Sequence, residues 1–238
     1  MKAYDQQTVD NPSWVKRLSH RRRFEVAAQL LSPQDGEAVL DYGTGDGYLV
    51  ALLAGRQPRA RYMAFEPVAE MRAQAQVLWS RAGIEPALYA QREAMRGLAV
   101  DKLACMEVME HLDEPLLAQA FADFRSLLAP GGLLMLSVPI ETGATALAKN
   151  GVRTLLGQRF VNGSLGNVLN AAAGRTERIA RASRDGYIET HVGFNHRRLA
   201  SRLAGEGFAV ERTVHAPLPW LGGLLNSQVF WVCRRAQA

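Results

Sequence analysis

The chain has 238 residues, 48% of them hydrophobic, and a formal net charge of +5 at pH 7. A chain of this length can bury a large core and is commonly a single α/β domain. Its two cysteines, Cys105 and Cys233, show no Cys-x-x-Cys spacing and no clustered histidines, so the sequence predicts neither a disulfide scaffold nor a metal site. No segment reaches the ~20 apolar residues of a membrane span. The start of the chain lacks a signal peptide's apolar run, so we expect a soluble, cytoplasmic protein.

Residues 1–35 form a basic segment ahead of the first predicted strand. Two runs of positive charge, at 16–17 and 20–23, are interleaved with apolar residues. At helical spacing Trp14 and Leu18 share one face, which predicts an amphipathic helix with a cationic side. Such a helix either covers the functional site or lies on a membrane surface as a peripheral contact.

An apolar strand at 37–40 leads into a loop with glycine at every second position and then into a helix at 48–54. The loop residues of interest are Asp41, Gly43, Thr44, Gly45 and Gly47. Glycines at these places let the backbone approach a nucleotide ligand more closely than a Cβ would allow. Dinucleotide-binding folds use Gly-x-Gly-x-x-Gly, whereas the third glycine here falls one residue early. The pattern therefore predicts a ligand other than a dinucleotide.

A second apolar strand at 61–65 ends in Glu66 and Pro67, roughly 20 residues past the loop. At this distance an acid accepts hydrogen bonds from the two ribose hydroxyls of a nucleotide. The alternative is that Glu66 caps the next helix, predicted at 68–82, where negative charge is favoured. Met71, one helical turn further on, either contacts an adenine ring or packs in the helix core.

Further strands and helices alternate along the chain. We predict strands at 87–90 and 102–106, a helix at 116–128 and a strand at 133–138. This alternation predicts a parallel sheet with helices on both faces. Pro130 ends the last of these helices, and the two glycines after it permit a tight turn into the fifth strand.

Asp41 with its Gly-x-Gly-x-Gly loop resembles the first motif of the class I S-adenosylmethionine-dependent methyltransferases, many of which carry the same Pro-Gly-Gly turn before strand five. Residues 103–112, Leu-Ala-Cys-Met-Glu-Val-Met-Glu-His-Leu, resemble the strand-four motif of the small-molecule methyltransferases of ubiquinone biosynthesis and of natural-product or sugar methylation. The resemblance implies a Rossmann-like sheet of seven strands, mostly parallel with the last antiparallel. It also implies helices on both faces, a helical cap after strand five, and S-adenosylmethionine as cofactor.

The resemblance places the cofactor in a core at 36–141. The cofactor-binding residues that it implies are Asp41, Gly43, Thr44, Gly45, Gly47, Glu66, Pro67, Met71, Glu93, Met106 and Glu107. Among these, Glu93 matches by position the acid that accepts the adenine amine, and Cys105 is expected with Met106 and Glu107 beside the methionine part of the cofactor. Glu110 and His111 are expected at the substrate-facing rim. There His111 is a candidate general base, since an unperturbed pKa of about 6.5 suits removal of a hydroxyl proton. Alternatively, both residues only order the loop.

Residues 142–186 form the part of the chain most specific to this protein. They carry seven basic and two acidic residues, a net charge of +5 that equals the charge of the whole chain. A connection of this length predicts a cap over the substrate side of the sheet. Its charge predicts an anionic acceptor, or one presented at an anionic surface, with Arg159 as a substrate contact. The alternative is a solvated lid whose arginines contact nothing in particular.

Residues 187–238 are predicted to complete the sheet with two strands around an apolar loop. His191, followed by a helix and a Gly-Phe-x-Val strand, resembles the approach to strand six in sugar, quinone and lipid-linked methyltransferases, where the histidine faces the substrate. We therefore expect His191 to be catalytic or to contact the substrate, and we take His196 and Trp220 as further substrate contacts. The alternative for both histidines is a helix cap or a core hydrogen bond.

Together these features predict transfer of a methyl group from S-adenosylmethionine to a hydroxyl of a sugar, glycolipid or other small acceptor in bacterial envelope biosynthesis, without a metal. A quinone or phenol acceptor is the second possibility, and it would require an uncharged pocket. A nucleic-acid substrate is not expected despite a pI near 9.5, because the chain lacks an Asn-Pro-Pro-Tyr type of strand-four motif and an RNA-binding module. An inactive cofactor-binding subunit of an assembly is the non-enzymatic alternative, and the intact glycine loop argues against it.

Overall fold

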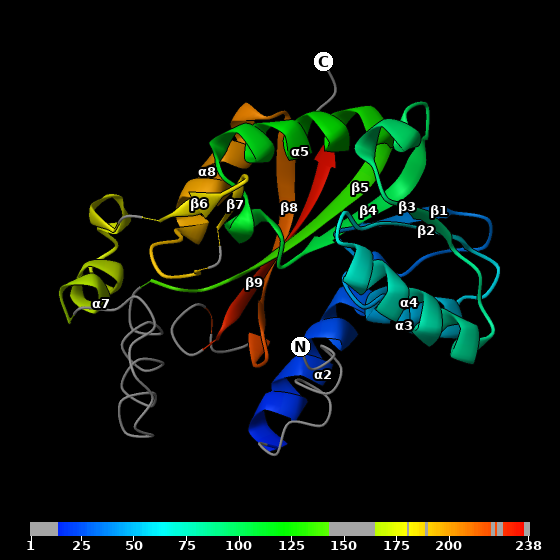
Figure 1. Cartoon of the computed structure of the whole chain (residues 1–238), viewed down its shortest axis with the longest axis horizontal. Coiled ribbons are helices and arrows are strands. Elements are labelled where there is room, and N and C mark those ends of the chain that lie inside the picture. Colours follow the sequence, from blue (N-terminus) through cyan, green and yellow to red (C-terminus); the bar gives the residue numbers. More distant parts are fainter. Residues whose placement is uncertain are drawn as a thin grey trace.

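The computed structural model describes residues 14–142, 165–179, 181–188, 190–219, 222 and 226–235. They form a seven-stranded sheet flanked by helices (Figure 1). The strands lie in the order β3-β2-β1-β4-β5-β9-β8. Their bounds are β1 Ala38–Tyr42, β2 Arg61–Phe65, β3 Ala87–Tyr89, β4 Val100–Met106, β5 Leu128–Pro139, β8 Phe208–Ala216 and β9 Gln228–Arg235.

The sheet is parallel except for its last strand. Parallel pairs join β1 to β2 and β4, β2 to β3, and β4 to β5, whereas β9 is antiparallel to both β5 and β8. The predicted Rossmann-like sheet is therefore confirmed. The chain runs outward from β1 to β3 and then crosses to β4 on the other side of β1, so the strand order reverses between β1 and β4. In open α/β sheets, ligands bind beyond the carboxyl ends of the strands at such a reversal.

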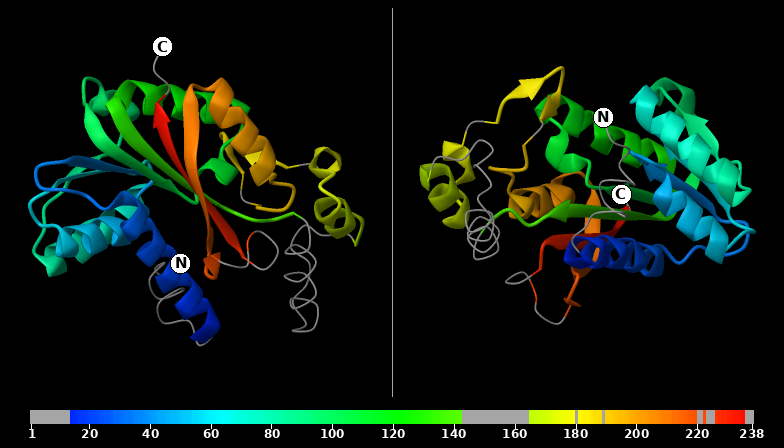
Figure 2. Two further views of the ribbon diagram at one scale, coloured as in Figure 1. Left: turned by 180° about the vertical axis from the view of Figure 1, so that it is seen from behind. Right: turned by 60° about the horizontal axis from the view of Figure 1, so that its bottom comes forward.

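Helices cover both faces of the sheet, as predicted (Figures 1 and 2). One face carries α5 Glu114–Leu127 and α8 His196–Gly205, and the other carries α2 Trp14–Leu31, α3 Tyr48–Arg56 and α4 Ala69–Ala82. Successive residues of β1 alternate between the faces, since Leu40 packs with the α5 and α8 side chains and Val39 with those of α2 and α3. Both faces of the central strands are thus apolar, which explains their continuous hydrophobic runs in the sequence.

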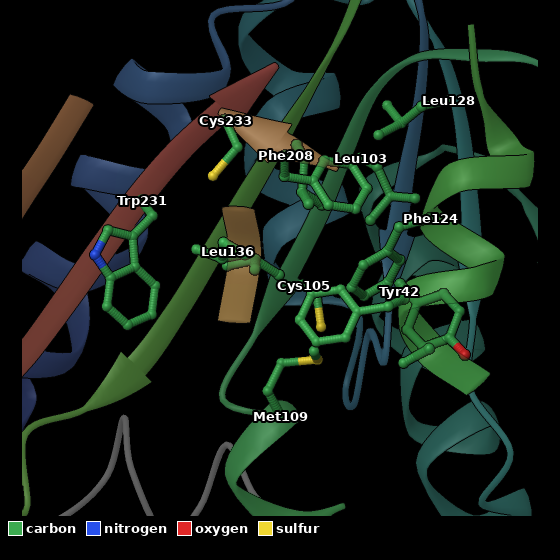
Figure 3. Close-up of a cluster of buried hydrophobic side chains, with 14 of the residues drawn as sticks. Tyr42, Leu103, Cys105, Met109, Phe124, Leu128, Leu136, Phe208, Trp231 and Cys233 are labelled. Atoms are coloured by element: carbon green, nitrogen blue, oxygen red, sulfur yellow. The ribbon is translucent and has the colours of Figure 1, made fainter. Parts of the chain in front are cut away.

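Figure 3 shows the core cluster between the sheet and helices α5 and α8. Phe124 of α5 and Phe208 of β8 are among its fully buried side chains. Cys105 belongs to the same cluster, and burial raises the pKa of its thiol. The expectation that Cys105 lies beside the cofactor is therefore wrong, because its side chain points to the core face of β4.

Helix α5 begins at Glu114, two residues before the predicted start. The carboxylate of Asp113 caps it by accepting a hydrogen bond from the Leu116 N–H at 3.2 Å, and Pro115 occupies the first turn. An acidic cap and a proline in the first turn satisfy or avoid the amide groups that have no partner at a helix start. This capping chemistry sets the true start of the helix.

Strand β5 begins at Leu128 and includes the Pro-Gly-Gly segment that the sequence places in a turn. Its pairing with β4 shifts register between Val100 and Lys102, and Gly131 has a φ of 74°. The three turn residues therefore form an irregular first part of the strand, much as a β-bulge does. The apolar part of the predicted strand is regular and fully paired.

The described part of the predicted cap contains helix α7 Leu165–Ala172 and a hairpin of β6 Ser183–Arg184 and β7 Tyr187–Ile188. Residues 143–164 lie outside the described residues. The sequence does not predict the hairpin, which is held by a bridge between Leu112 and Tyr187 and by a 3.0 Å hydrogen bond from the Asp113 N–H to the Gly186 carbonyl. The hairpin thus lies against the loop that follows β4.

Helix α2 extends further along the chain than the predicted basic helix. Its carboxyl half packs Ala27, Ala28 and Leu31 against the sheet and α3, while Arg21 and Arg22 are exposed. Among the helices of the described residues, none combines the length and the apolar character needed to cross a membrane.

Candidate active site

The glycine loop lies at the carboxyl end of β1, where the strand order reverses. Gly43, Gly45 and Gly47 have φ angles of 80°, 59° and 80°, which strain any other residue. A Cβ on Gly43 would overlap Val108, and one on Gly47 would lie 2.6 Å from the ring of Trp79. A Cβ on Gly45 would meet nothing within 4 Å. Gly45 therefore faces open space, whereas Gly43 and Gly47 also make room for protein side chains. The expected close approach of a ligand to all three glycines stays a prediction.

Glu66 is buried at the end of β2 and directs its carboxylate at this loop. One oxygen accepts a hydrogen bond from the Gly45 N–H and the other from the Val68 N–H, both at 2.9 Å. Burial raises the pKa of Glu66, and the two N–H donors oppose that rise. Glu66 thus bonds the start of α4, as the capping alternative predicts, and also holds the loop. Each carboxylate oxygen can accept a second hydrogen bond, so capacity remains for two hydroxyl donors.

Asp41 is the buried penultimate residue of β1, next to the loop. The Thr44 hydroxyl donates a 2.7 Å hydrogen bond to its carboxylate, which closes the loop on itself. Burial raises the pKa of Asp41 to about 7, with smaller contributions from the nearby acids Glu66 and Asp46. Asp41 and Thr44 therefore shape the loop from within.

The other predicted cofactor residues lie at the same edge of the sheet. Pro67 is exposed after Glu66, Met71 is half-buried in the first turn of α4, and Glu93 is exposed on the 3-10 helix after β3. Met106 is the half-buried last residue of β4. The fold thus brings these residues to the carboxyl ends of neighbouring strands, and their contacts with a cofactor stay predictions.

Glu107 directly follows β4 with a φ of 55°. Its carboxylate accepts hydrogen bonds from Arg23 of α2 at 2.9 Å and from Gln228 of β9 at 2.8 Å, and Gln228 also donates to the Ser137 hydroxyl at 2.9 Å. This network joins the N-terminal helix to the edge of the sheet that carries the glycine loop. Sequence reasoning missed Arg23 and Gln228 because no local pattern marks partners so far apart in the chain.

Glu110, His111 and His191 meet just after β4. Each residue offers one oxygen or nitrogen atom that could bind a metal, and these three atoms all lie within 4.8 Å of one another. The distance from Glu110 Oε1 to His191 Nδ1 is 3.8 Å. The structure thus brings together two histidines that the sequence singles out in separate motifs. Glu110 is fully buried, and burial raises its pKa well above the usual value. Its expected place at the rim is therefore wrong, because the 3-10 turn Met109–His111 directs its side chain inward.

His111 is held in one tautomer by the β6–β7 hairpin. Its Nδ1 atom lies 2.8 Å from the Ile188 carbonyl oxygen, which can only accept, so Nδ1 carries the proton and Nε2 keeps its lone pair. The ring stacks on Tyr187 with centroids 4.9 Å apart and meets His191 edge-on at 4.6 Å. Burial lowers the pKa of His111, which favours the neutral ring. The arrangement presents a fixed imidazole with an available lone pair.

Arg181 connects the cap to this cluster. Its guanidinium donates to the backbone carbonyl of Glu110 and, at 3.2 Å, to that of Thr190. The guanidinium also lies over the ring of Phe194, and its Cζ atom is 5.6 Å from the ring centroid. The sequence marks Arg181 only as one of the cap's basic residues, and the contact with Glu110 becomes visible only in the fold.

His196, a further predicted substrate residue, is not part of the cluster. His196 begins α8, where its Nδ1 atom is 3.5 Å from the Thr142 hydroxyl and burial lowers its pKa to about 4. Arg159 and Trp220 lie outside the described residues. The proposed contacts of these three residues with a substrate stay predictions.

A hollow of about 620 Å³ opens elsewhere on the molecule. Tyr62, Met63 and Ala87 line it, at the amino ends of β2 and β3. Because the glycine loop and the histidine cluster follow the carboxyl ends of their strands, this hollow is separate from the candidate active site.

Comparison with known proteins identifies the family of the chain and solved structures with a similar fold. A family model described as a methyltransferase domain matches residues 14–212. No protein of curated function matches the chain. Magnesium protoporphyrin IX methyltransferase of Synechocystis PCC 6803, solved with bound S-adenosylhomocysteine, is similar at 18% identity over 94% of this chain and 88% of that one, with a TM-score of 0.62.

Two further solved structures show a similar fold. An S-adenosylmethionine-dependent methyltransferase from Clostridium acetobutylicum ATCC 824 has 13% identity over 98% of this chain and 96% of its own, with a TM-score of 0.59. Mitomycin 7-O-methyltransferase has 15% identity over 99% of this chain and 61% of its own, with a TM-score of 0.59. At such identities the similarity shows a shared fold.

Proposed function

The chain belongs to the methyltransferase-domain family, and we propose that it transfers the methyl group of S-adenosylmethionine to a hydroxyl of a small acceptor. The family match at 14–212 includes the glycine loop, Glu66 and the histidine cluster. The observation that carries the proposal is the 2.9 Å hydrogen bond from the Gly45 N–H to Glu66. It joins the ends of two parallel strands beside the reversal of strand order, where such sheets bind their ligands.

The residues at this reversal fit S-adenosylmethionine. Gly45 leaves the space over the loop open, and Glu66 keeps acceptor capacity for the two ribose hydroxyls. When bound, S-adenosylmethionine supplies a methyl group activated by the positive charge on its sulfur. Transfer would require the acceptor oxygen about 3 Å from that carbon and in line with the leaving sulfur, and the residues around the site would lower the barrier by holding it there.

His111 is the proposed general base. Its Nε2 lone pair takes the proton of the acceptor hydroxyl as the new bond forms. The Ile188 carbonyl fixes the tautomer, and the stacked ring of Tyr187 fixes the plane of the imidazole. Because its pKa is lowered, the ring is already unprotonated at neutral pH. His191, edge-on to His111, is the proposed second contact for the acceptor.

The acceptor that we propose is an anionic sugar, glycolipid or related small molecule of envelope biosynthesis. Arg175, Arg178 and Arg184 of the described cap are exposed, and positive side chains around a site raise the local concentration of anionic ligands. The exposed Arg21 and Arg22 of α2 suit contact with an anionic membrane surface that carries a lipid-linked acceptor. Peripheral membrane contact is therefore part of the proposal.

One observation favours a phenol or quinone acceptor as the second candidate. Tyr187 is 49% exposed, and one face of its ring stacks on His111. Aromatic faces bind other planar rings by offset stacking. The exposed ring of Tyr187, next to the histidine cluster, therefore supports a planar acceptor as the second candidate.

The acceptor class is tested with S-adenosylmethionine labelled in its methyl group. Wild-type protein is incubated with cell extract, which is then separated into lipid and glycolipid, small-molecule and RNA fractions. Gly45→Arg is the blank, because the arginine side chain fills the open space and the φ of 59° strains any residue with a Cβ. Label in the glycolipid fraction supports the envelope acceptor, and label only in aromatic small molecules supports the second candidate. Label in RNA, or no label above the blank, contradicts both.

A further inference from the structure

The Glu110 carboxylate is buried without a hydrogen-bond donor. The residue is 0% exposed, and neither carboxylate oxygen accepts a hydrogen bond from another residue that the structure describes. Arg181 donates to the backbone carbonyl of Glu110 and not to its side chain. A buried carboxylate without donors is costly unless it is protonated or a cation compensates it. A cation bound at Glu110 would compensate the charge of the ionised carboxylate.

Two imidazoles lie where such a partner would bind. The ligand-type atoms of Glu110, His111 and His191 are within 4.8 Å of one another, and Glu110 Oε1 is 3.8 Å from His191 Nδ1. Two ligands of one ion at about 2.1 Å each lie at most about 4.2 Å apart, so the cluster needs only a small side-chain adjustment. Two imidazole nitrogens and one carboxylate oxygen are the ligand set of catalytic Zn²⁺ and of non-haem Fe²⁺ sites.

We propose that Glu110, His111 and His191 form a binding site for a divalent transition-metal ion beside the cofactor edge of the sheet. The sequence predicts no metal, because its histidines are not clustered and two of the ligands are separated from the third by the cap. The fold brings them together through the β6–β7 hairpin, which lies against the loop after β4. This proposal differs from the metal-free reaction that the sequence predicts.

The surroundings of His111 are those of a metal ligand. Metal-binding histidines almost always donate their other ring N–H to a carboxylate or a backbone carbonyl, which fixes the tautomer and orients the ring. The Nδ1–H of His111 donates to the Ile188 carbonyl at 2.8 Å, which directs its Nε2 lone pair away from the hairpin. Tyr187 stacks on the same ring at 9° between planes and restricts its rotation.

The role of the ion rests on the proposed function. Three protein ligands leave coordination positions open, and an acceptor hydroxyl bound there becomes more acidic. The O–H bond breaks and its proton passes to water, an O–CH₃ bond forms, and the S–CH₃ bond breaks with its electron pair left on sulfur. In this case His111 acts as a ligand and not as the base, because the one lone pair on Nε2 cannot do both.

The test is a titration of tag-free, full-length protein with Co²⁺ after a chelator has removed bound metal. The absorption bands of Co²⁺ report coordination by nitrogen and oxygen. We expect one Co²⁺ per chain in the wild type, and at least about 10-fold weaker binding in Glu110→Gln and in His191→Ala. His215→Ala is the matched control, since His215 is a half-buried histidine on β8 outside the cluster and should bind Co²⁺ as the wild type does.

Wild-type protein that shows no Co²⁺ bands, or a His191→Ala variant that binds Co²⁺ as tightly as the wild type, overturns the proposal. The side chain of His191 is 40% exposed, so this variant leaves the core intact and decides the question even where Glu110→Gln fails to fold. Calorimetry with S-adenosylhomocysteine on the same samples separates the two claims. If the wild type binds S-adenosylhomocysteine but not Co²⁺, only the metal site is contradicted. If it binds Co²⁺ but not S-adenosylhomocysteine, only the proposed function is contradicted.

Discussion

The carboxylate of Glu66, at the end of β2, accepts a 2.9 Å hydrogen bond from the backbone N–H of Gly45, in the loop after β1. Two parallel strands are thereby joined at their carboxyl ends, and the shape of the loop depends on an acid from the next strand. The same carboxylate also bonds the start of α4 through Val68. One side chain therefore fixes the three backbone segments that surround the proposed cofactor site.

Replacement of Glu66 by alanine should weaken cofactor binding strongly. Hydrogen bonds to a charged group contribute about 1.5–3 kcal/mol each, so we expect an affinity for S-adenosylhomocysteine at least ~10-fold lower. The rise in Tm on adding S-adenosylhomocysteine measures this loss. Glu70→Ala, an exposed acid in the first turn of the same helix, is the control and should keep the full rise. Equal rises in the two variants would show that Glu66 does not bind the cofactor.

Gly47→Ala should destabilise the fold, whereas Gly55→Ala should not. At Gly47 the positive φ costs about 1–2 kcal/mol, and overlap of the new methyl with the buried ring of Trp79 costs about 1–3 kcal/mol more. Gly55 lies in α3 with nothing within 4 Å of an added Cβ, so alanine there should stabilise by about 0.5–1 kcal/mol. Urea unfolding of both variants checks this difference, and similar effects would contradict the packing described for Trp79.

Asp41 should make stability fall as pH rises. Its pKa is raised from 3.8 to about 7 in the folded protein, so between these values the folded state holds more protons than the unfolded state. The free energy of unfolding therefore decreases through this window, by up to about 4 kcal/mol. Asp41→Asn cannot ionise and should lack this contribution while still accepting the Thr44 hydrogen bond. Denaturant unfolding at pH values from 4 to 8 should show the free energy of unfolding of the variant rising relative to that of the wild type. A difference between the two proteins that does not change with pH would contradict the raised pKa.

Arg23→Ala should loosen the attachment of α2. Arg23 and Glu107 form a 2.9 Å ion pair with side chains only 13% and 25% exposed, so loss of the arginine removes a cationic partner from a partly buried acid. We expect a loss of about 1–3 kcal/mol in the free energy of unfolding. A double-mutant cycle with Glu107→Gln measures the coupling, with the exposed Arg22→Ala as control. A coupling energy near zero would mean that the pair does not hold the helix.

The features that the sequence predicted are those that depend on local pattern. Alternating apolar segments predicted the parallel sheet. The glycine spacing, with Glu66 after the next strand, marked the loop that the structure places at the reversal of strand order. The N-terminal cap by Asp113 and the irregular start of β5 moved two boundaries, because caps and register depend on neighbouring backbone groups that hydrophobic periodicity does not report.

The features that the sequence did not predict depend on contacts between distant residues. The burial of Glu110 and the partners of Glu107 arise only when α2, the cap hairpin and β9 pack around the end of β4. The reasons for Gly43 and Gly47 were likewise hidden, since Val108 and Trp79 approach them from other elements. At both positions the fold supplies a reason for glycine in addition to the predicted approach of a ligand.

Calorimetric titration of the wild type and of Gly45→Arg with S-adenosylhomocysteine tests the cofactor site most directly. The open space over Gly45 predicts one binding site per chain in the wild type and none in the variant, with unchanged circular dichroism. A wild type that binds nothing at millimolar ligand, or a folded Gly45→Arg variant that binds as tightly as the wild type, would contradict the assignment of this loop and Glu66 to S-adenosylmethionine.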